Sequence, residues 1–465
     1  MFVPSARRAR AQLGVGVGRL PVLERRFSSK SVAEPKAKLL VLGTGWGGFR
    51  LAREVDKKKY DVTVISPRNH FLFTPLLPST TVGTLEFRCI QEPVRTIKGL
   101  QYLQAHCTGV DFKTKTVRCR EVFKGTEHDL DYDHLVIATG AQNNTFGVPG
   151  VTEENHVFFL KQLGDARNIR NRLLECFERA ASPFISEAER SRLLSFVVVG
   201  GGPTSIEYAA ELHDFLTSDV KRWYPDLQEK VSVHLVEASD HIMGSFDDKL
   251  ISYTTRLLEN RKVEVLLNTA VKSVGQTECT LGDGRKLPFG LMASEQRYVW
   301  STGLAPTELV SSMEGIEKDR GRIKIDSRLR VPGIEGVFAM GDAAVNPENP
   351  LGPLAQVADQ QGKYLAKCFR KTNPLDEDMP PFEYRHLGSM AQVGDWKAIA
   401  DFKGIGGGGG APGDSRKPGP VLEGFLAFAT WRSAYWTKTV SLANKALIPM
   451  HWFKAWAFGR DISRF

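Results

Sequence analysis

The chain has 465 residues, of which 42% are hydrophobic, and its formal net charge is +9. This length suffices for two or three domains with a sizeable core, and the composition is typical of a globular protein rather than a disordered or fibrous one. Because the positive charge is concentrated in residues 1–35 and 431–465, it indicates targeting and surface attachment and argues against a nucleic-acid-binding groove.

The N-terminal segment, residues 1–35, is rich in Arg and Ser, poor in acidic side chains and free of any long apolar run. Such a composition is typical of an organelle transit peptide rather than a secretory signal peptide. Residues 25–28, Arg-Arg-Phe-Ser, resemble a mitochondrial processing site with cleavage after Phe27. We therefore expect a mitochondrial transit peptide, with a disordered basic tail or a plastid destination as the alternatives.

A glycine-rich motif follows the first predicted strand, residues 38–42. Gly43, Gly45 and Gly48 have the spacing G-x-G-x-x-G and precede a helical segment, residues 49–55. In this strand–turn–helix context the motif predicts a dinucleotide-binding fold. Gly43 permits the tight turn, Gly45 lets a pyrophosphate approach the backbone, and Gly48 lets helix and strand pack closely.

The second predicted strand, residues 62–65, ends at Ser66, where such folds usually place an acidic side chain. The Ser66 hydroxyl can bond one ribose oxygen. Arg68 offers a partner for a 2′-phosphate, so NADP is one possible ligand of this site. An apolar, proline-rich run, residues 71–78, follows.

Two later motifs favour FAD at the first site. Thr139 and Gly140 end an apolar strand, and Gly341 and Asp342 follow another. We expect Gly341 and Asp342 to open a helix, with the Asp342 carboxylate reaching the ribitol and pyrophosphate of a flavin. The alternative role for Asp342 is that of a helix N-cap.

A second glycine-rich motif follows the strand at residues 196–199. Gly200 and Gly202 lead through Thr204 into a helical pattern, and Ser205 replaces the third glycine. Serine is small enough to allow close helix–strand packing. This motif predicts a second dinucleotide-binding fold.

An acidic residue, Glu237, ends the following strand, residues 231–236. A carboxylate in this place hydrogen-bonds the ribose hydroxyls of NAD and repels a 2′-phosphate. Glu237 lies further from Gly202 than usual, and the polar segment 217–228 accounts for the extra length. The second site is therefore predicted to bind NADH.

From about Lys36 to the C-terminus, the chain resembles the type II (alternative, rotenone-insensitive) NADH:quinone oxidoreductases, flavoproteins with two dinucleotide-binding domains. The most specific motifs are the run at 66–79 and Ala-Gln-x-Ala-x-Gln at 355–360. Both glycine-rich motifs, Ser301-Thr302-Gly303 and Gly341-Asp342 also match. The resemblance implies FAD in the first fold, NADH in the second with Gly303 contributing to cofactor binding, and ubiquinone as the electron acceptor.

Three side chains are candidates for the chemistry by this resemblance. Gln356 and Gln360 lie four apart, on one face of a predicted helix. Their amides can bond a quinone carbonyl without carrying charge into an apolar slot; the alternative is ordinary helix-surface polarity. Glu207 is a carboxyl candidate near the nicotinamide–flavin junction, or else a structural hydrogen-bond partner.

Cysteine usage separates this chain from related disulfide reductases, which carry a Cys-x-x-x-x-Cys pair after the first nucleotide-binding unit. Here Cys89 stands alone, and the six cysteines show neither a Cys-x-x-Cys pair nor metal-ligand spacing. Electrons are therefore not predicted to leave through a dithiol, and neither a metal site nor an EF-hand is expected.

The C-terminal region carries four of the eight Trp between residues 431 and 456. A helical apolar stripe is predicted over 422–447, and Pro449 is expected to break it. Since Arg432, Lys438 and Lys445 interrupt any spanning segment, we expect a peripheral attachment to the membrane surface. The alternative is packing on the body or on a second subunit, and the resemblance implies a homodimer.

The predicted fold class is α/β, with two Rossmann-type domains and a C-terminal amphipathic helical region. The FAD domain, 36–160 and 305–403, is split by an inserted NADH domain, 161–304. A glycine-rich linker, 404–420, leads to the membrane-binding region, 421–465. The predicted function is non-proton-pumping NADH:ubiquinone oxidation–reduction on the mitochondrial inner membrane. The alternative is an FAD- and NADH-binding redox-sensing regulatory protein that resembles apoptosis-inducing factors.

Overall fold

The computed structural model describes residues 36–294, 304–371, 379–405 and 419–464. Three predictions therefore lie wholly or mostly outside the described residues. They are the transit peptide, the cofactor-binding role of Gly303, and the glycine-rich linker at 404–420.

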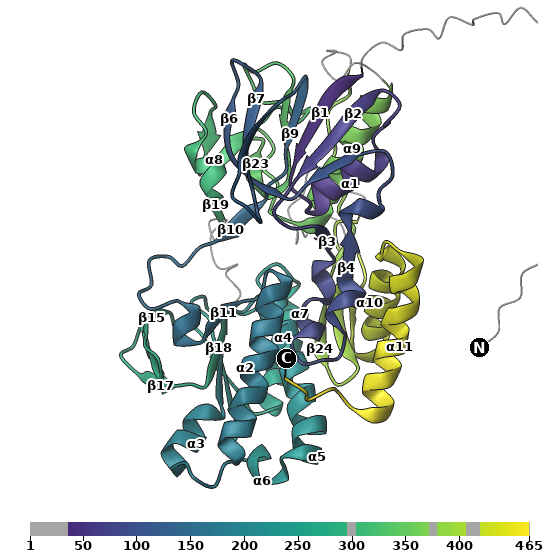
Figure 1. Cartoon of the computed structure of the whole chain (residues 1–465). Coiled ribbons are helices and arrows are strands. Elements are labelled where there is room, and N and C mark those ends of the chain that lie inside the picture. The colour runs from purple at the N-terminus through teal and green to yellow at the C-terminus, as the bar shows by residue number, and fades with distance from the viewer. Residues whose placement is uncertain (1–35, 295–303, 372–378, 406–418, 465) are drawn as a thin grey trace, which may run out of the picture. The chain divides into compact units, whose positions relative to one another are not determined.

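The first of two parallel sheets has the strand order β22-β9-β1-β2-β5 (Figure 1). Strand β9 is buried at every position, as is typical of a parallel sheet covered on both faces. Strand β22 joins its edge although it comes after the whole second sheet in the chain. The strands are β1 (Ala37–Leu42), β2 (Tyr60–Ile65), β5 (Gln101–Leu103), β9 (His134–Ile137) and β22 (Val337–Ala339).

The second parallel sheet has the order β11-β18-β12-β13-β14. Its strands are β11 (Val157–Phe159), β12 (Ser195–Val199), β13 (Ser232–Val236), β14 (Val263–Leu266) and β18 (Leu291–Ser294). The sheet lies in sequence between β9 and β22, so the predicted fold class, with one nucleotide-binding domain inserted in another, is confirmed.

Helices cover these sheets and connect their strands. They are α1 (Trp46–Glu54), α2 (Leu163–Ala181), α3 (Glu187–Leu193), α4 (Pro203–Phe215), α5 (Lys221–Trp223), α6 (Pro225–Gln228), α7 (Asp248–Asn260), α8 (Glu308–Ser312) and α9 (Ala355–Lys371). Helices α1 and α9 cross closely, since a Cβ on Gly362 would lie 2.4 Å from the Gly47 carbonyl oxygen. This crossing holds the start of α9 beside the first glycine-rich loop.

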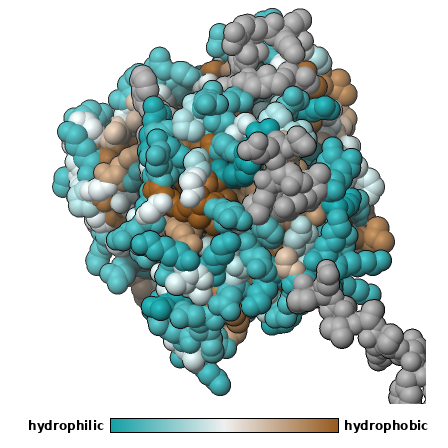
Figure 2. Space-filling view, turned by 90° about the horizontal axis from the view of Figure 1, so that it is seen from above, coloured by the Kyte–Doolittle hydropathy of each residue, from teal (hydrophilic) through white to brown (hydrophobic). Residues whose placement is uncertain are grey.

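Short strands outside the two parallel sheets complete the two domains, and all of them pair antiparallel except β23, which pairs parallel to β21. An antiparallel sheet formed by β6 (Ala105–Asp111), β7 (Thr116–Glu121) and β8 (Glu127–Asp131) lies in sequence between β5 and β9. The others are β3 (His70–Leu72), β4 (Gln91–Pro93), β10 (Ala141–Asn143), β15 (Val271–Val274), β16 (Glu278–Leu281), β17 (Lys286–Pro288), β19 (Leu304–Pro306), β20 (Lys318–Asp319), β21 (Arg322–Lys324) and β23 (Ala344–Val345). Viewed from above (Figure 2), hydrophilic side chains cover most of the visible face, and a hydrophobic area is exposed near its centre.

The C-terminal region consists of a small antiparallel sheet and two helices. The sheet contains β24 (Ser389–Gly394), β25 (Lys397–Asp401) and β26 (Val421–Glu423), and the helices are α10 (Gly424–Lys438) and α11 (Leu442–Phe458). Among the described residues, no helix combines the length and the apolarity needed to cross a bilayer.

The expected break at Pro449 is wrong, because α11 continues through it and the chain turns at 439–441 instead. Proline lacks the N–H that would bond the carbonyl of Lys445. The indole Nε1 of Trp436 donates to that carbonyl at 2.7 Å. A side chain of α10 thus supplies the hydrogen bond that Pro449 removes from α11.

Trp436→Phe is expected to destabilise the protein by about 1 kcal/mol, the net contribution of one hydrogen bond. In a Pro449→Ala background the cost should shrink, because the new N–H of residue 449 can bond the Lys445 carbonyl. Urea unfolding of the four proteins in this double-mutant cycle measures the coupling. If Trp436→Phe lowers the free energy of unfolding equally in both backgrounds, the indole of Trp436 does not replace the N–H that Pro449 lacks.

Candidate active site

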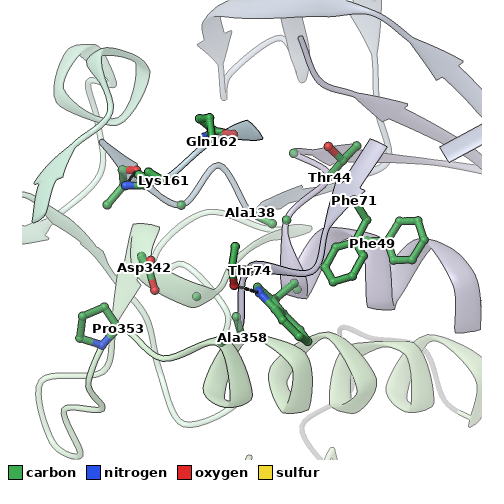
Figure 3. Close-up of a pocket in the computed structure, with 18 of the residues that line it drawn as sticks. Thr44, Phe49, Phe71, Thr74, Ala138, Lys161, Gln162, Asp342, Pro353 and Ala358 are labelled. Carbon is green, nitrogen blue, oxygen red and sulfur yellow. Dashed lines mark hydrogen bonds between the residues drawn. The ribbon is translucent and has the colours of Figure 1, made fainter. Parts of the chain in front are cut away.

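A cavity of about 2090 Å³ extends along both glycine-rich loops, the start of α9 and the end of α10. Pockets for one drug-sized ligand have roughly 300–1,000 Å³. The cavity is therefore large enough for more than one ligand. Figure 3 shows part of its wall, with Lys161 and Gln162 on one side and Asp342 on another.

The first glycine-rich loop has the geometry that its sequence predicts. Gly43 has φ +106°, and a Cβ there would lie 2.4 Å from the Ala138 carbonyl oxygen. A Cβ on Gly48 would lie 2.1 Å from the Gly43 carbonyl oxygen, so Gly48 permits the strand–helix contact. A Cβ on Gly45 would meet nothing within 4 Å, and Gly45 lines the cavity. The loop backbone is thus open to a ligand at Gly45.

Ser66 and Arg68 both line the cavity at the end of β2. The Ser66 hydroxyl is buried and shares a 3.0 Å hydrogen bond with that of Thr44, a partner that the spacing did not suggest. Arg68 donates from Nε to the His70 carbonyl and from a terminal nitrogen to the side chain of Gln162. Burial lowers the pKa of Arg68.

Thr139 and Gly140 lie at the cavity wall just after β9. The Thr139 hydroxyl oxygen is buried and has no hydrogen-bond partner among the described residues. An orphaned buried hydroxyl costs free energy unless a ligand or water bonds it. Gly140 has φ +69°, a conformation that favours glycine.

The segment at Gly341 and Asp342 differs from the expectation of a helix start. Gly341–Ala343 forms a single 3₁₀ turn whose N-cap is Met340, and the chain then enters β23. Asp342 is therefore not the N-cap, and it lines the cavity (Figure 3). The buried side chain of Gln361, which sequence reasoning missed, accepts the Gly341 N–H at 2.7 Å and fixes this turn.

The apolar run after β2 packs an aromatic wall against α1. The rings of Phe49 and Phe71 stack with their centres 4.7 Å apart (Figure 3). The ring of Trp46 meets that of Phe71 edge-on at 5.0 Å. The indole of Trp46 donates to the Thr74 hydroxyl at 3.1 Å. The run is a packed loop and also borders the cavity.

The carboxylate of Glu237 fixes the second glycine-rich loop by hydrogen bonds to the backbone. This carboxylate is fully buried and accepts the backbone N–H groups of Gly201, at 2.6 Å, and Ser239, at 2.7 Å. Gly200 and Gly202 are buried and do not line the cavity, whereas Thr204 does. Glu237 thus ties the loop to the end of β13, and its reach to a ribose stays a prediction.

Glu207 lines the cavity from α4 and is 8% exposed. Its carboxylate accepts the backbone N–H of Gln392 at 3.2 Å. Tyr435 lines the same cavity, and its pKa is raised by burial and by the charge of Glu207. Burial lowers the pKa of Lys438, which also lines the cavity, while the Asp359 charge opposes that shift. For the segment that carries Tyr435 and Lys438, the sequence pattern predicts membrane attachment, or packing on the body or on a second subunit, and no contribution to the site.

Gln356 and Gln360 line the cavity, and both bond the backbone of residues 385–388. Gln356 accepts the Leu387 N–H at 3.1 Å and donates to the Gly388 carbonyl at 3.4 Å. Gln360 accepts the N–H of Arg385 at 3.0 Å and donates to its carbonyl at 2.8 Å. The two amides thus hold the start of the C-terminal region on α9.

Residues 37–362 match the family model described as pyridine nucleotide-disulphide oxidoreductase. Two parallel nucleotide-binding sheets around one cavity are the architecture of this class, so the chain is a pyridine-nucleotide flavoprotein by fold and site. Residues 386–461 match a second model, the NDH2 C-terminal domain.

Individual relatives narrow the class. The chain is 41% identical over 436 residues to a Dictyostelium discoideum protein named probable NADH dehydrogenase, covering 92% of this chain and 91% of that protein. It is 40% identical to internal alternative NAD(P)H-ubiquinone oxidoreductase A1, mitochondrial, of Solanum tuberosum, covering 93% and 89%. External NADH-ubiquinone oxidoreductase 2, mitochondrial, of Saccharomyces cerevisiae is 38% identical, with 92% and 82% covered.

Among solved structures, that of NDH2 from Plasmodium falciparum in complex with NADH has a TM-score of 0.83 at 27% identity, covering 92% of this chain and 100% of that one. The chain belongs to the family of type II, or alternative, NADH:ubiquinone oxidoreductases.

Proposed function

We propose that this chain binds FAD and NADH along its cavity and passes electrons from NADH to ubiquinone. The alternative NADH–ubiquinone oxidoreductase activity follows from its membership of the family. The single observation that supports the arrangement is the continuity of the cavity, which joins both glycine-rich loops to Gln356, Gln360 and Tyr435. The redox-sensing regulatory protein considered from the sequence is not supported, because the C-terminal region matches the NDH2 domain.

The residues at the first loop fit FAD. The open backbone at Gly45, the orphaned hydroxyl of Thr139 and the cavity-facing Asp342 offer a pyrophosphate approach and polar partners for a ribityl chain. Ser66 and Arg68 border the same part of the cavity. When bound there, FAD supplies a ring that accepts two electrons with a hydride and gives them up to a quinone.

Residues of the chain are proposed to hold NADH and ubiquinone at different places in the cavity. The second loop, with Thr204 at the cavity and Glu237 behind it, is proposed to position NADH. The aromatic wall formed by Phe49 and Phe71 is proposed to exclude water from the part of the cavity beside the first glycine-rich loop. Glu207 is proposed to hold a proton near the junction, since it is buried and borders the cavity beside Tyr435.

Gln356→Met is expected to raise the KM for a short-chain ubiquinone about tenfold, the effect of losing about 1.4 kcal/mol of hydrogen bonding. Reduction of the flavin by NADH alone should be unchanged. Stopped-flow flavin reduction and steady-state quinone kinetics separate the two half-reactions. If Gln356 only fixes residues 385–388, Gln356→Met lowers the unfolding midpoint and leaves the quinone KM unaltered, which would refute its role at the quinone.

The C-terminal helices are proposed to attach the protein to a membrane surface. Large apolar side chains of α10 and α11 are exposed; they include Phe425, Leu426, Leu442, Met450, Phe453, Trp456 and Phe458. The guanidinium of Arg432 lies 4.3–5.1 Å from the ring centres of Trp396, Phe428 and Trp452. Aromatic and cationic side chains together favour the interface of an anionic bilayer.

The mitochondrial inner membrane is the proposed site, because internal and external mitochondrial relatives both match the chain. A homodimer through the C-terminal region is also proposed, by the family resemblance. Sedimentation with cardiolipin-containing vesicles and analytical ultracentrifugation test the two proposals. A protein that stays in the supernatant at low salt, or that sediments as a monomer at micromolar concentration, would contradict them.

A further inference from the structure

Two cysteines on neighbouring strands lie directly opposite each other. Strands β6 and β7 are antiparallel and side by side (Figure 1), and their register pairs Cys107 with Cys119. Opposite residues of antiparallel strands have Cα atoms about 4.5 or 5.5 Å apart, and both values fall in the range of about 4.4–6.8 Å that a disulfide requires. The register therefore places the two residues at a backbone spacing that a disulfide can bridge, just before the register shift between Cys107 and Gly109.

The two thiols are free and in contact. Contact between the two side chains raises the pKa of Cys107 and lowers the pKa of Cys119, so the Cys119 sulfur is the one that more readily becomes a thiolate. By contrast, burial raises the pKa of Cys89, Cys176 and Cys279 to about 11. The contact distinguishes the pair, because the thiolate is the reactive form of cysteine.

Access comes through one member of the pair. Cys107 is half-buried and lines the cavity, whereas Cys119 is 1% exposed. A small oxidant entering the cavity meets the sulfur of Cys107 first. Cys119 is the neighbouring cysteine whose sulfur can react with Cys107 once Cys107 has been oxidised to a sulfenic acid.

We propose that Cys107 and Cys119 form a redox-modification site, where a peroxide converts the two thiols into a reversible disulfide on the cavity wall. This inference stands apart from the proposed electron transfer to quinone, since neither thiol takes part in it. A disulfide would join β6 covalently to β7.

The oxidation balances as two successive substitutions. The Cys119 thiolate takes the proton of the Cys107 thiol while the Cys107 sulfur attacks one peroxide oxygen; an S–O bond forms, the O–O bond breaks, and water leaves with a proton from solvent. The Cys119 sulfur then attacks the sulfenic sulfur of Cys107; the S–S bond forms, the S–O bond breaks, and the second water carries away the Cys119 proton. The two thiols together lose two electrons, and the peroxide is reduced to two waters.

The test uses the full chain with its flavin bound, treated with hydrogen peroxide. Free thiols are blocked with light iodoacetamide, disulfides are then reduced with dithiothreitol, and new thiols are labelled with heavy iodoacetamide before mass spectrometry. Heavy label at Cys107 and Cys119 alone is expected, and dithiothreitol before the first step should abolish it. Light label at both residues, or sulfinic acid at Cys107 with light-labelled Cys119, would overturn the proposal.

Variants provide the matched control. Cys119→Ala should lose the heavy label at Cys107 and stop at sulfenic or sulfinic acid there. Cys279→Ala, which removes a buried cysteine of β16, should keep the disulfide between Cys107 and Cys119. A disulfide of Cys107 that persists in Cys119→Ala would contradict the pairing.

Discussion

Gly45→Glu is expected to yield a folded protein that has lost its FAD and with it the oxidation of NADH by quinone. A Cβ on Gly45 meets nothing within 4 Å, so the new side chain has room, but that room is the cavity. A carboxylate about 4 Å from a phosphate charge costs about 4 kcal/mol at an effective dielectric constant of 20. That cost weakens FAD binding by about a thousandfold.

Absorbance of the purified protein at the flavin band and the activity with NADH and short-chain ubiquinone measure the effect. Gly109→Glu is the matched control, because a Cβ there also meets nothing within 4 Å and Gly109 lies outside the cavity wall. The control should keep FAD and activity. A Gly45→Glu protein that retains a full complement of FAD would remove the cofactor from the first loop.

Arg460→Met is expected to destabilise the protein by about 3–5 kcal/mol, the cost of leaving a buried charge without its partner. The Arg460 guanidinium lies 2.8 Å from the Asp219 carboxylate and 3.7 Å from that of Glu211, both 2% exposed. Ser79 and Thr84 donate to Glu211 at 2.6 Å each. One arginine thus joins the C-terminal tail to α4, to the π-helical turn Leu216–Val220 and to Thr84 of the first domain.

Urea unfolding of the FAD-loaded protein checks this value. Lys454→Met, which removes a cation from α11 outside this network, serves as the control and should change the free energy of unfolding by less than about 1 kcal/mol. Glu211→Leu combined with Arg460→Met should cost less than the sum of the two single changes. Strict additivity would show that the two side chains do not act as a unit.

Local signals predicted the glycine-rich loops well, because strand, turn and helix are contiguous there. Gly43 and Gly48 take up the close contacts that their spacing indicates. The two glycine-rich motifs likewise predicted two Rossmann-type domains, and each contains a five-stranded parallel sheet.

Features that depend on distant partners could not be predicted. The helix expected at Gly341 is one 3₁₀ turn, fixed by Gln361 from α9. Pro449 does not end its helix, because Trp436 from α10 supplies the missing donor. The pairing of Gln356 and Gln360 with residues 385–388 has no local signature.

The charged and aromatic composition of the C-terminal region did not indicate that some of its residues line the site. Tyr435 and Lys438 lie in a segment whose composition is typical of a membrane interface, yet both line the cavity. The end of α10 therefore lines the candidate site, in addition to the membrane attachment proposed for the C-terminal helices. Only the three-dimensional structure, in which that helix end lines the same cavity as residues of α4 and α9, reveals the second role.

One experiment tests electron transfer from NADH to quinone along the cavity most directly. The purified full chain is mixed with NADH, and a short-chain ubiquinone is added while flavin absorbance and NADH consumption are followed. Rapid bleaching by NADH and rapid recovery on adding quinone are expected. Bleaching that ubiquinone does not reverse would contradict the assignment of quinone as the electron acceptor.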